Sequence, residues 1–177
     1  MITCTKTANT WPRRKFISSL TSTAVAATIV KPLTSFATSN QALNDLTVQH
    51  VIDLIMKSIP GAPFKDTVDT IKSGDANQKV AGIVTTMFAT DDVIEKTAKL
   101  GSNFIIAHEP TFYNHTDDTG WLQNDDVYQY KKALLERDNI VVWRCHDYIH
   151  AHKPDGVLMG VLSALGWSKY YDASNPI

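Results

Sequence analysis

Histidine and carboxylate side chains are concentrated in two short segments of this sequence. His108-Glu109 follows the apolar stretch 104–107, and the run HDYIHAH occupies positions 146–152, directly after a second apolar stretch. Imidazole nitrogens and carboxylate oxygens bind divalent metals, and the same groups transfer protons in acid–base catalysis. Both segments are therefore candidates for a metal site or for proton-transfer chemistry.

The His108-Glu109 dipeptide by itself is an ambiguous signal. A histidine at a strand end can simply bond to a backbone carbonyl. Adjacent residues of a strand also point in opposite directions. Both residues could serve one site only if the turn at Pro110 bends the second one inward, or if two ions lie roughly 3.5–4 Å apart. The second histidine segment favours the functional interpretation. Cys145, beside His146, admits a Cys–His nucleophile, although a lone cysteine is more often a small buried residue.

The elements expected to position these segments alternate between strands and helices. We expect helices over 46–59, 91–100, 125–137 and 155–165, strands over 80–88, 104–107 and 140–144, and an edge strand over 66–71. This order is typical of an α/β fold, a mostly parallel sheet with helices on its faces. The carboxyl ends of such strands share one edge, where ligands bind. The two histidine segments should therefore meet at that edge.

Residues 1–37 have the features of an export signal. They contain Arg13-Arg14 within PRRKFI, a mildly apolar stretch at 20–30, and Ser35-Phe36-Ala37 as a small-x-small cleavage site. This arrangement resembles a twin-arginine signal and predicts a periplasmic protein whose domain spans 38–177. No window matches the roughly 18–20 apolar residues of a membrane span, so we expect no stable membrane insertion.

The charge balance argues against a nucleic-acid partner. Removing residues 1–37 takes away five of the 17 basic residues and none of the 18 acids, which leaves a net charge of −6. Binding to phosphates needs clustered lysine and arginine, which an acidic domain does not provide.

Two longer runs resemble a known family. They are GIVTTMFATDDVIEKTAKLGSNFIIAHEPTFY and NIVVWRCHDYIHAHKPDGVLMGVLSALGW. Together they resemble the Nif-three-like family, also described as dinuclear metal centre hexameric proteins. The resemblance covers most of residues 46–172. Its most specific parts are the strand–His–x–Pro unit and the histidine segment that precedes Asp155-Gly156.

The resemblance implies a set of site residues. His108 matches the first histidine of the family's ligand pair, Glu109 stands in place of the second, and His150 stands in place of a ligand aspartate. His146 matches a histidine beside the metals, and we expect it to act as a general acid or base. The expected ligands are thus His108, Glu109 and His150, with one or two divalent ions (Zn, Mn, Fe, Ni or Co) per chain.

This sequence also differs from the family pattern at its C-terminal end. Family members supply a further His and Glu from a C-terminal segment, and nothing before Ile177 matches it. The chain is then either the N-terminal half of the family fold or a domain with half of the site.

The function implied by the resemblance is that of a metal-dependent hydrolase for an unidentified small-molecule substrate, in a homo-oligomer that would be a hexamer. Some family members are labelled as homologues of a type-two GTP cyclohydrolase, but this sequence has no Gly-rich phosphate loop. The enzyme class therefore stays open. The alternative is a non-catalytic metal-binding or assembly module.

Overall fold

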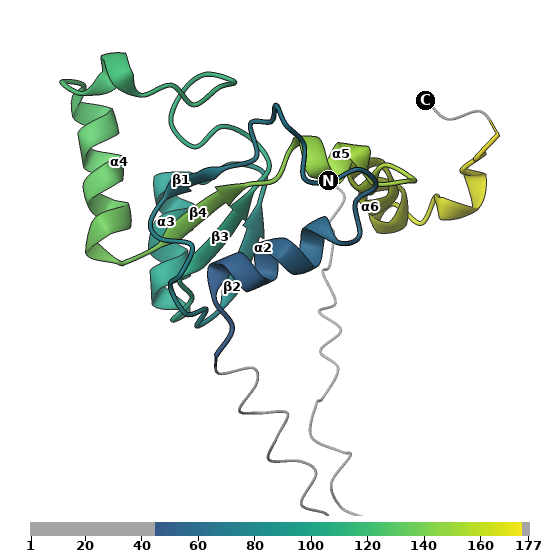
Figure 1. Ribbon diagram of the computed structural model, residues 1–177, viewed down its shortest axis with the longest axis horizontal. Coiled ribbons are helices and arrows are strands. Elements are labelled where there is room, and N and C mark those ends of the chain that lie inside the picture. Colours follow the sequence, from purple (N-terminus) through teal and green to yellow (C-terminus); the bar gives the residue numbers. More distant parts are fainter. Residues whose placement is uncertain (1–44, 175–177) are drawn as a thin grey trace, which may run out of the picture. The chain divides into compact units, whose positions relative to one another are not determined.

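The computed structural model describes residues 45–174, and its elements alternate as an α/β fold requires (Figure 1). The helices are α2 (Val48–Met56), α3 (Asp91–Lys99), α4 (Asp126–Arg137), α5 (Asp147–Ala151) and α6 (Gly156–Ala164), with 3-10 turns at Gly120–Leu122 and Ser168–Tyr170. The strands are β1 (Ile71–Ser73), β2 (Ile83–Thr86), β3 (Phe104–Ala107) and β4 (Val141–Arg144). The predicted fold class is confirmed.

The four strands form one mixed sheet in the order β1-β4-β3-β2. Strands β2, β3 and β4 are parallel, and their last residues, Thr86, Ala107 and Arg144, lie in register across the sheet. Strand β1 runs antiparallel to β4, with Ile71 opposite Trp143. The residues that precede β1 therefore lie at the same edge as the residues that follow β3 and β4.

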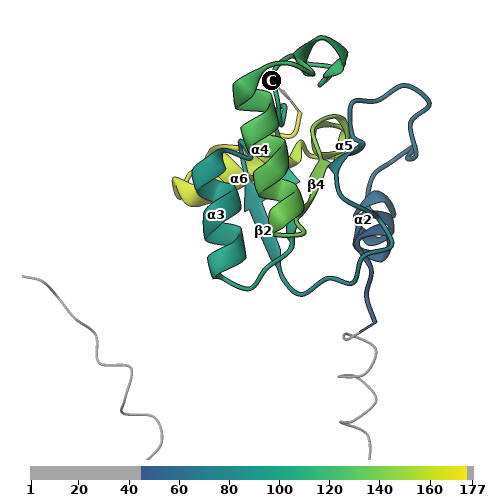
Figure 2. The same cartoon turned by 90° about the vertical axis from the view of Figure 1, so that its left-hand side faces the viewer.

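Helices cover both faces of the sheet, because the side chains of each strand alternate between two apolar cores. Helix α2 packs Val48 and Ile52 on the face formed by Phe104, Val141 and Trp143. The opposite face packs Ile105 and Val142 against residues of α3 and α4, namely Ile94, Leu134 and Leu135. Figure 2 shows α3 and α4 beside each other on this second face, with α2 on the other side. Helices α5 and α6 follow the carboxyl end of β4 (Figure 1).

Local sequence signals fix where the helices begin. The side chains of Thr47, Thr90, Asp125 and Asp155 each accept a hydrogen bond from a backbone N–H in the first turn of the helix that follows. The predicted helix bounds agree with the observed ones within about two residues at most ends.

One predicted element differs from the structure, and one observed helix was not predicted. The edge strand expected over 66–71 is wrong in position, because β1 begins only at Ile71; the backbone N–H of Val68 instead donates to the Asp147 carboxylate at 3.0 Å. Helix α5 was not predicted at all.

The predicted signal peptide, 1–37, lies outside the described residues. Among the described helices, none has both the length and the apolar character needed to cross a bilayer.

Candidate metal centre

The strand register places His108 and the segment after β4 side by side. Ala107 pairs with Arg144, and the N–H of Cys145 donates to the carbonyl of Ala107 at 2.8 Å. The N–H of His108 continues the β2–β3 ladder by donating to Thr86 at 3.1 Å. The backbone on both sides of the candidate site is therefore held by sheet hydrogen bonds.

Helix α5 then turns two further histidines toward His108. His146 is the N-cap residue of α5, and His150 lies one helical turn later, so their rings are on the same side of the helix. Ring nitrogens of His108, His146 and His150 all lie within 4.8 Å of one another. The ring centroids of His108 are 4.8 Å from His146 and 5.1 Å from His150. The structure thus gathers three of the four predicted site residues.

Each of these rings has a partner for its Nδ1 atom outside the cluster. Nδ1 of His108 lies 3.2 Å from the Cys145 carbonyl oxygen. Nδ1 of His146 lies 3.0 Å from the Asp147 carboxylate, and Nδ1 of His150 lies 2.7 Å from the Asp155 carboxylate. Such contacts fix the tautomer and orientation of metal-binding histidines. They leave Nε2 of each ring as the nitrogen available to a ligand.

The two carboxylates are themselves anchored. Asp147 also accepts hydrogen bonds from Thr67 at 2.8 Å and from the Val68 N–H. Burial alone would raise the pKa of Asp147, but the hydrogen bonds from His146, Thr67 and Val68 outweigh it and lower the pKa to about 2. Asp155 caps α6 through the N–H of Leu158 at 2.9 Å. The orientation of His146 and His150 therefore depends on the segment before β1 and on the start of α6.

Asp69 supports the same segment from the other side. Its buried carboxylate accepts the N–H groups of His146 and Tyr148, both at 2.7 Å, at the start of α5. This contact exists because β1 is antiparallel to β4, which brings residue 69 beside residues 146–148. A five-residue helix has little stability of its own, so this cap explains why α5 forms there.

Glu109, a predicted ligand, lies outside the three-histidine cluster. Alternate residues of a strand point to the same face of the sheet. His108 is therefore on the same face as Phe104 and Ile106, which pack on the α2 side. Glu109 is on the opposite face, with Ile105 and Ala107. Its carboxylate lies 3.9 Å from the Arg144 guanidinium. Its role as a ligand stays a prediction.

Arg144 joins the strand ends to the long loop after His108. Its side chain is fully buried and donates to the carbonyl oxygens of His108, at 3.2 Å, and of His115. The His115 ring lies edge-on to His146, with 5.4 Å between centroids. His115 is thus a fourth imidazole at the border of the cluster, whereas His50 belongs to the capping box of α2 and contributes nothing here.

The structure adds four residues to the candidate site that sequence analysis did not identify: Asp69, Arg144, Asp147 and Asp155. Their roles depend on contacts across the sheet edge. Only the adjacency of Asp147 to His146 and the five-residue spacing from His150 to Asp155 could have indicated two of them.

Cys145 is expected to be unreactive. Its side chain is buried, and burial together with the nearby charge of Asp69 raises the pKa of the thiol to about 12. Treatment of the folded protein with iodoacetamide at pH 8, followed by peptide mapping, should leave the Cys145 peptide unmodified. The same treatment in 8 M urea should modify it. Rapid alkylation in the folded state would instead support the Cys–His nucleophile.

The fold and the site define an α/β protein with a histidine cluster at the carboxyl edge of a parallel sheet. Residues 46–175 match the family model of Duf34/NIF3 (NGG1p interacting factor 3). The chain therefore belongs to the Duf34/NIF3 family, as the sequence resemblance predicted. A comparison with curated proteins finds no match.

Solved structures share the fold at low sequence identity. The Staphylococcus aureus protein SA1388 is 21% identical, with a TM-score of 0.56 over 70% of this chain and 34% of that one. A Bacillus cereus protein related to NIF3 is 20% identical, with a TM-score of 0.50 over 59% of this chain and 28% of that one. The reduced form of HcgD from Methanocaldococcus jannaschii is 17% identical, with a TM-score of 0.54 over 67% and 47%. The match thus spans about a third of the length of SA1388.

Proposed function

We propose that this chain binds a divalent metal ion through His108, His146 and His150 and serves as a metal-dependent hydrolase. The observation that supports the proposal most directly is the meeting of three imidazoles within 4.8 Å, each with Nδ1 already engaged. Family membership and this cluster are both compatible with metal binding.

The donor set fits a borderline metal. Neutral imidazole suits Zn, Fe, Co and Ni, whereas Mg and Ca prefer all-oxygen sites. Nitrogens around one tetrahedral ion with metal–nitrogen bonds of about 2.0–2.1 Å lie roughly 3.4 Å apart. The longest separation in the cluster, 4.8 Å, would therefore need to shorten by roughly 1.4 Å on binding, through small movements of the rings together with their Nδ1 partners. Glu109 is proposed as a further ligand, for a second ion.

Three protein ligands are the number found in catalytic rather than structural zinc sites, because one position stays open for water or substrate. When bound, the ion supplies an activated water nucleophile and polarises the electrophilic substrate atom. The chain's own groups orient the ligands: Asp147 holds His146, and Asp155 holds His150. A largely apolar cleft of about 570 Å³ beside His108, lined by Ile106, Ile149 and Val161, could receive an apolar part of the substrate.

The test is the metal content of the purified full-length chain, measured by elemental mass spectrometry. We expect near-stoichiometric Zn, Fe, Co, Ni or Mn in the parent protein and a loss of at least tenfold in a His108→Ala, His150→Ala double variant. The matched control is His50→Ala, which removes a histidine of the α2 cap and should keep the metal. A parent protein that holds no metal even after reconstitution contradicts the proposal.

Two further readouts refine the assignment. His146→Ala that loses the metal identifies His146 as a ligand. A variant that keeps the metal but loses hydrolysis in a substrate screen identifies His146 as the acid or base predicted from the sequence. Metal binding without any hydrolysis would favour the alternative, a non-catalytic metal-binding or assembly module.

We also propose that the protein is exported to the periplasm by the twin-arginine route and assembles as a homo-oligomer, a hexamer by family resemblance. The basis for export is Arg13-Arg14 and the Ser35-Phe36-Ala37 site. Replacing Arg13 and Arg14 by lysine is expected to keep the precursor in the cytoplasm, while the parent is recovered from the periplasm with its mature N-terminus near residue 38. The same cytoplasmic and periplasmic amounts for the parent and the variant would contradict export. The mass of the homo-oligomer is measured separately by light scattering.

A further inference from the structure

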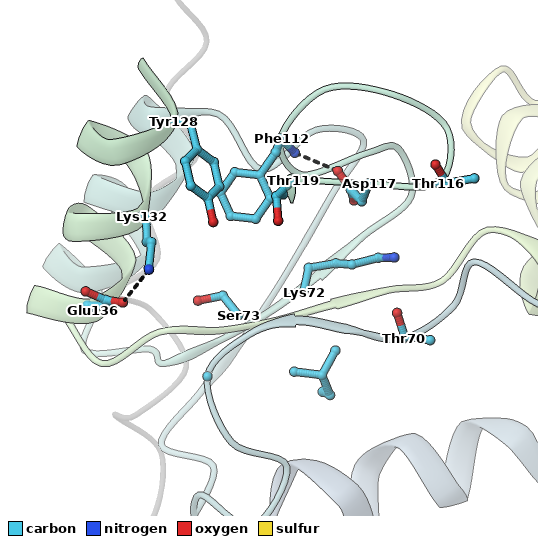
Figure 3. Close-up of a pocket in the computed structure, with 12 residues that line it drawn as sticks. Thr70, Lys72, Ser73, Phe112, Thr116, Asp117, Thr119, Tyr128, Lys132 and Glu136 are labelled. Carbon is cyan, nitrogen blue, oxygen red and sulfur yellow. Dashed lines mark hydrogen bonds and ion pairs between the residues drawn. The ribbon is translucent and has the colours of Figure 1, made fainter. Parts of the chain in front are cut away.

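A second pocket lies on the opposite side of the sheet from the histidine cluster. It has a volume of about 520 Å³ and is formed by β1, by the loop 112–119 and by one face of α4. Helix α4 presents Tyr128, Lys132 and Glu136 to it, at the four-residue spacing that places side chains on one stripe of a helix. Strand β1 contributes Lys72 and Ser73, which line the pocket on the side of β1 that faces the loop 112–119 (Figure 3).

Several hydroxyl and ammonium groups of this pocket donate no hydrogen bond to any of residues 45–174. Figure 3 shows the hydroxyls of Ser73, Thr119 and Tyr128 and the ammonium of Lys132 around a common space, with the Lys72 side chain beside it. Tyr128 is only 9% exposed, and its hydroxyl has a single long contact, 3.5 Å from the Gln123 amide. Its aromatic ring packs edge-on against Phe112, with 4.9 Å between centroids.

The two carboxylates of the pocket, Asp117 and Glu136, in contrast, already have hydrogen-bond or ion-pair partners. Asp117 accepts the N–H groups of Thr111 and Phe112, both at 2.8 Å. Glu136 lies 3.8 Å from Lys132 on the same helix, a solvent-exposed contact that an incoming anion can replace. No carboxylate of residues 45–174 lies within ion-pair distance of Lys72. Burial lowers the pKa of this lysine, and the more distant charges of Asp117 and Asp69 offset that effect only in part. A half-buried lysine without a paired acid is stabilised by an anionic ligand.

We propose that this pocket binds a small organic oxyanion, whose carboxylate or phosphate group contacts Lys132, Tyr128 and Ser73 beside Lys72, and whose body lies against the Phe112 and Tyr128 rings. The volume suits a small metabolite. The site is separate from the proposed metal centre and does not depend on it.

The test is a titration of the ¹⁵N-labelled full chain with inorganic phosphate and, separately, with acetate, followed by NMR. We expect saturable shifts in the amide signals of Ser73, Thr119 and Tyr128 with at least one of the two anions. The stronger of the two identifies the ligand group as phosphate or carboxylate. Lys132→Gln and Tyr128→Phe should each weaken binding about three- to tenfold, and Lys72→Gln should weaken it similarly.

The matched controls are Lys57→Gln and Lys169→Gln, exposed lysines outside the pocket, which should leave the affinity unchanged. Tyr128→Phe keeps the buried ring, so it tests the hydroxyl even if a lysine variant folds poorly. Shifts that never saturate, shifts confined to the histidine cluster, or equal affinities in the Lys132, Tyr128 and control variants would each overturn the proposal.

Discussion

Replacing Arg144 by alanine is expected to lower the free energy of unfolding by about 3–5 kcal/mol, because it removes a buried charged donor from several partners at once. The guanidinium is fully buried and bonds to the carbonyl oxygens of His108 and His115, with Glu109 at 3.9 Å. Alanine would leave these acceptors without a partner and would open a cavity at the end of β4. The loss is a large fraction of the roughly 5–15 kcal/mol by which a domain is stable. Urea unfolding followed by circular dichroism measures it.

Two comparisons make this result specific. Arg137→Ala removes an exposed arginine that, within residues 45–174, forms an ion pair only with its neighbour Asp138, so the unfolding midpoint of this variant should stay near that of the parent. Arg144→Lys keeps the charge but not the planar fork of donors, and should recover only part of the stability. If Arg144→Ala unfolds at the same urea concentration as the parent, the guanidinium does not hold the loop as described.

Replacing Asp69 by asparagine is expected to weaken metal binding about 10–100-fold, although residue 69 is not among the proposed ligands. The carboxylate accepts the N–H groups of His146 and Tyr148, and asparagine would present an N–H₂ group to one of these donors. The start of α5 would then shift, and with it both His146 and His150 relative to His108. Titration with Zn²⁺ in competition with a chromophoric chelator measures the affinity.

The control for this variant is Asp66→Asn, which changes an exposed acid in the same segment and should leave the affinity at the parent value. Urea unfolding of Asp69→Asn is measured alongside. A fall in stability with unchanged Zn²⁺ affinity would show that Asp69 only caps α5 and does not position the histidines.

The class of fold, and the strand ends at which the candidate site lies, could be predicted from the sequence. The apolar stretches 104–107 and 141–144 are short and continuous, as buried parallel strands are, and signals such as the cap Thr47 and the stops Gly101 and Gly166 mark the helices. These signals are local, because they depend on residues within one turn or one strand of each other. For the same reason His108, His146 and His150 could be selected as candidates from sequence alone.

Which side chains meet at these strand ends depends on the tertiary fold. Because strand side chains alternate, His108 lies on the α2 side of the sheet and Glu109 lies on the side of Arg144. Which residue of the dipeptide faces the other histidines could not be told from the sequence alone. Helix α5 depends on Asp69, which lies 77 residues before His146 in the sequence. An antiparallel first strand brings them together, and such pairing between distant segments leaves no local pattern in the residues themselves.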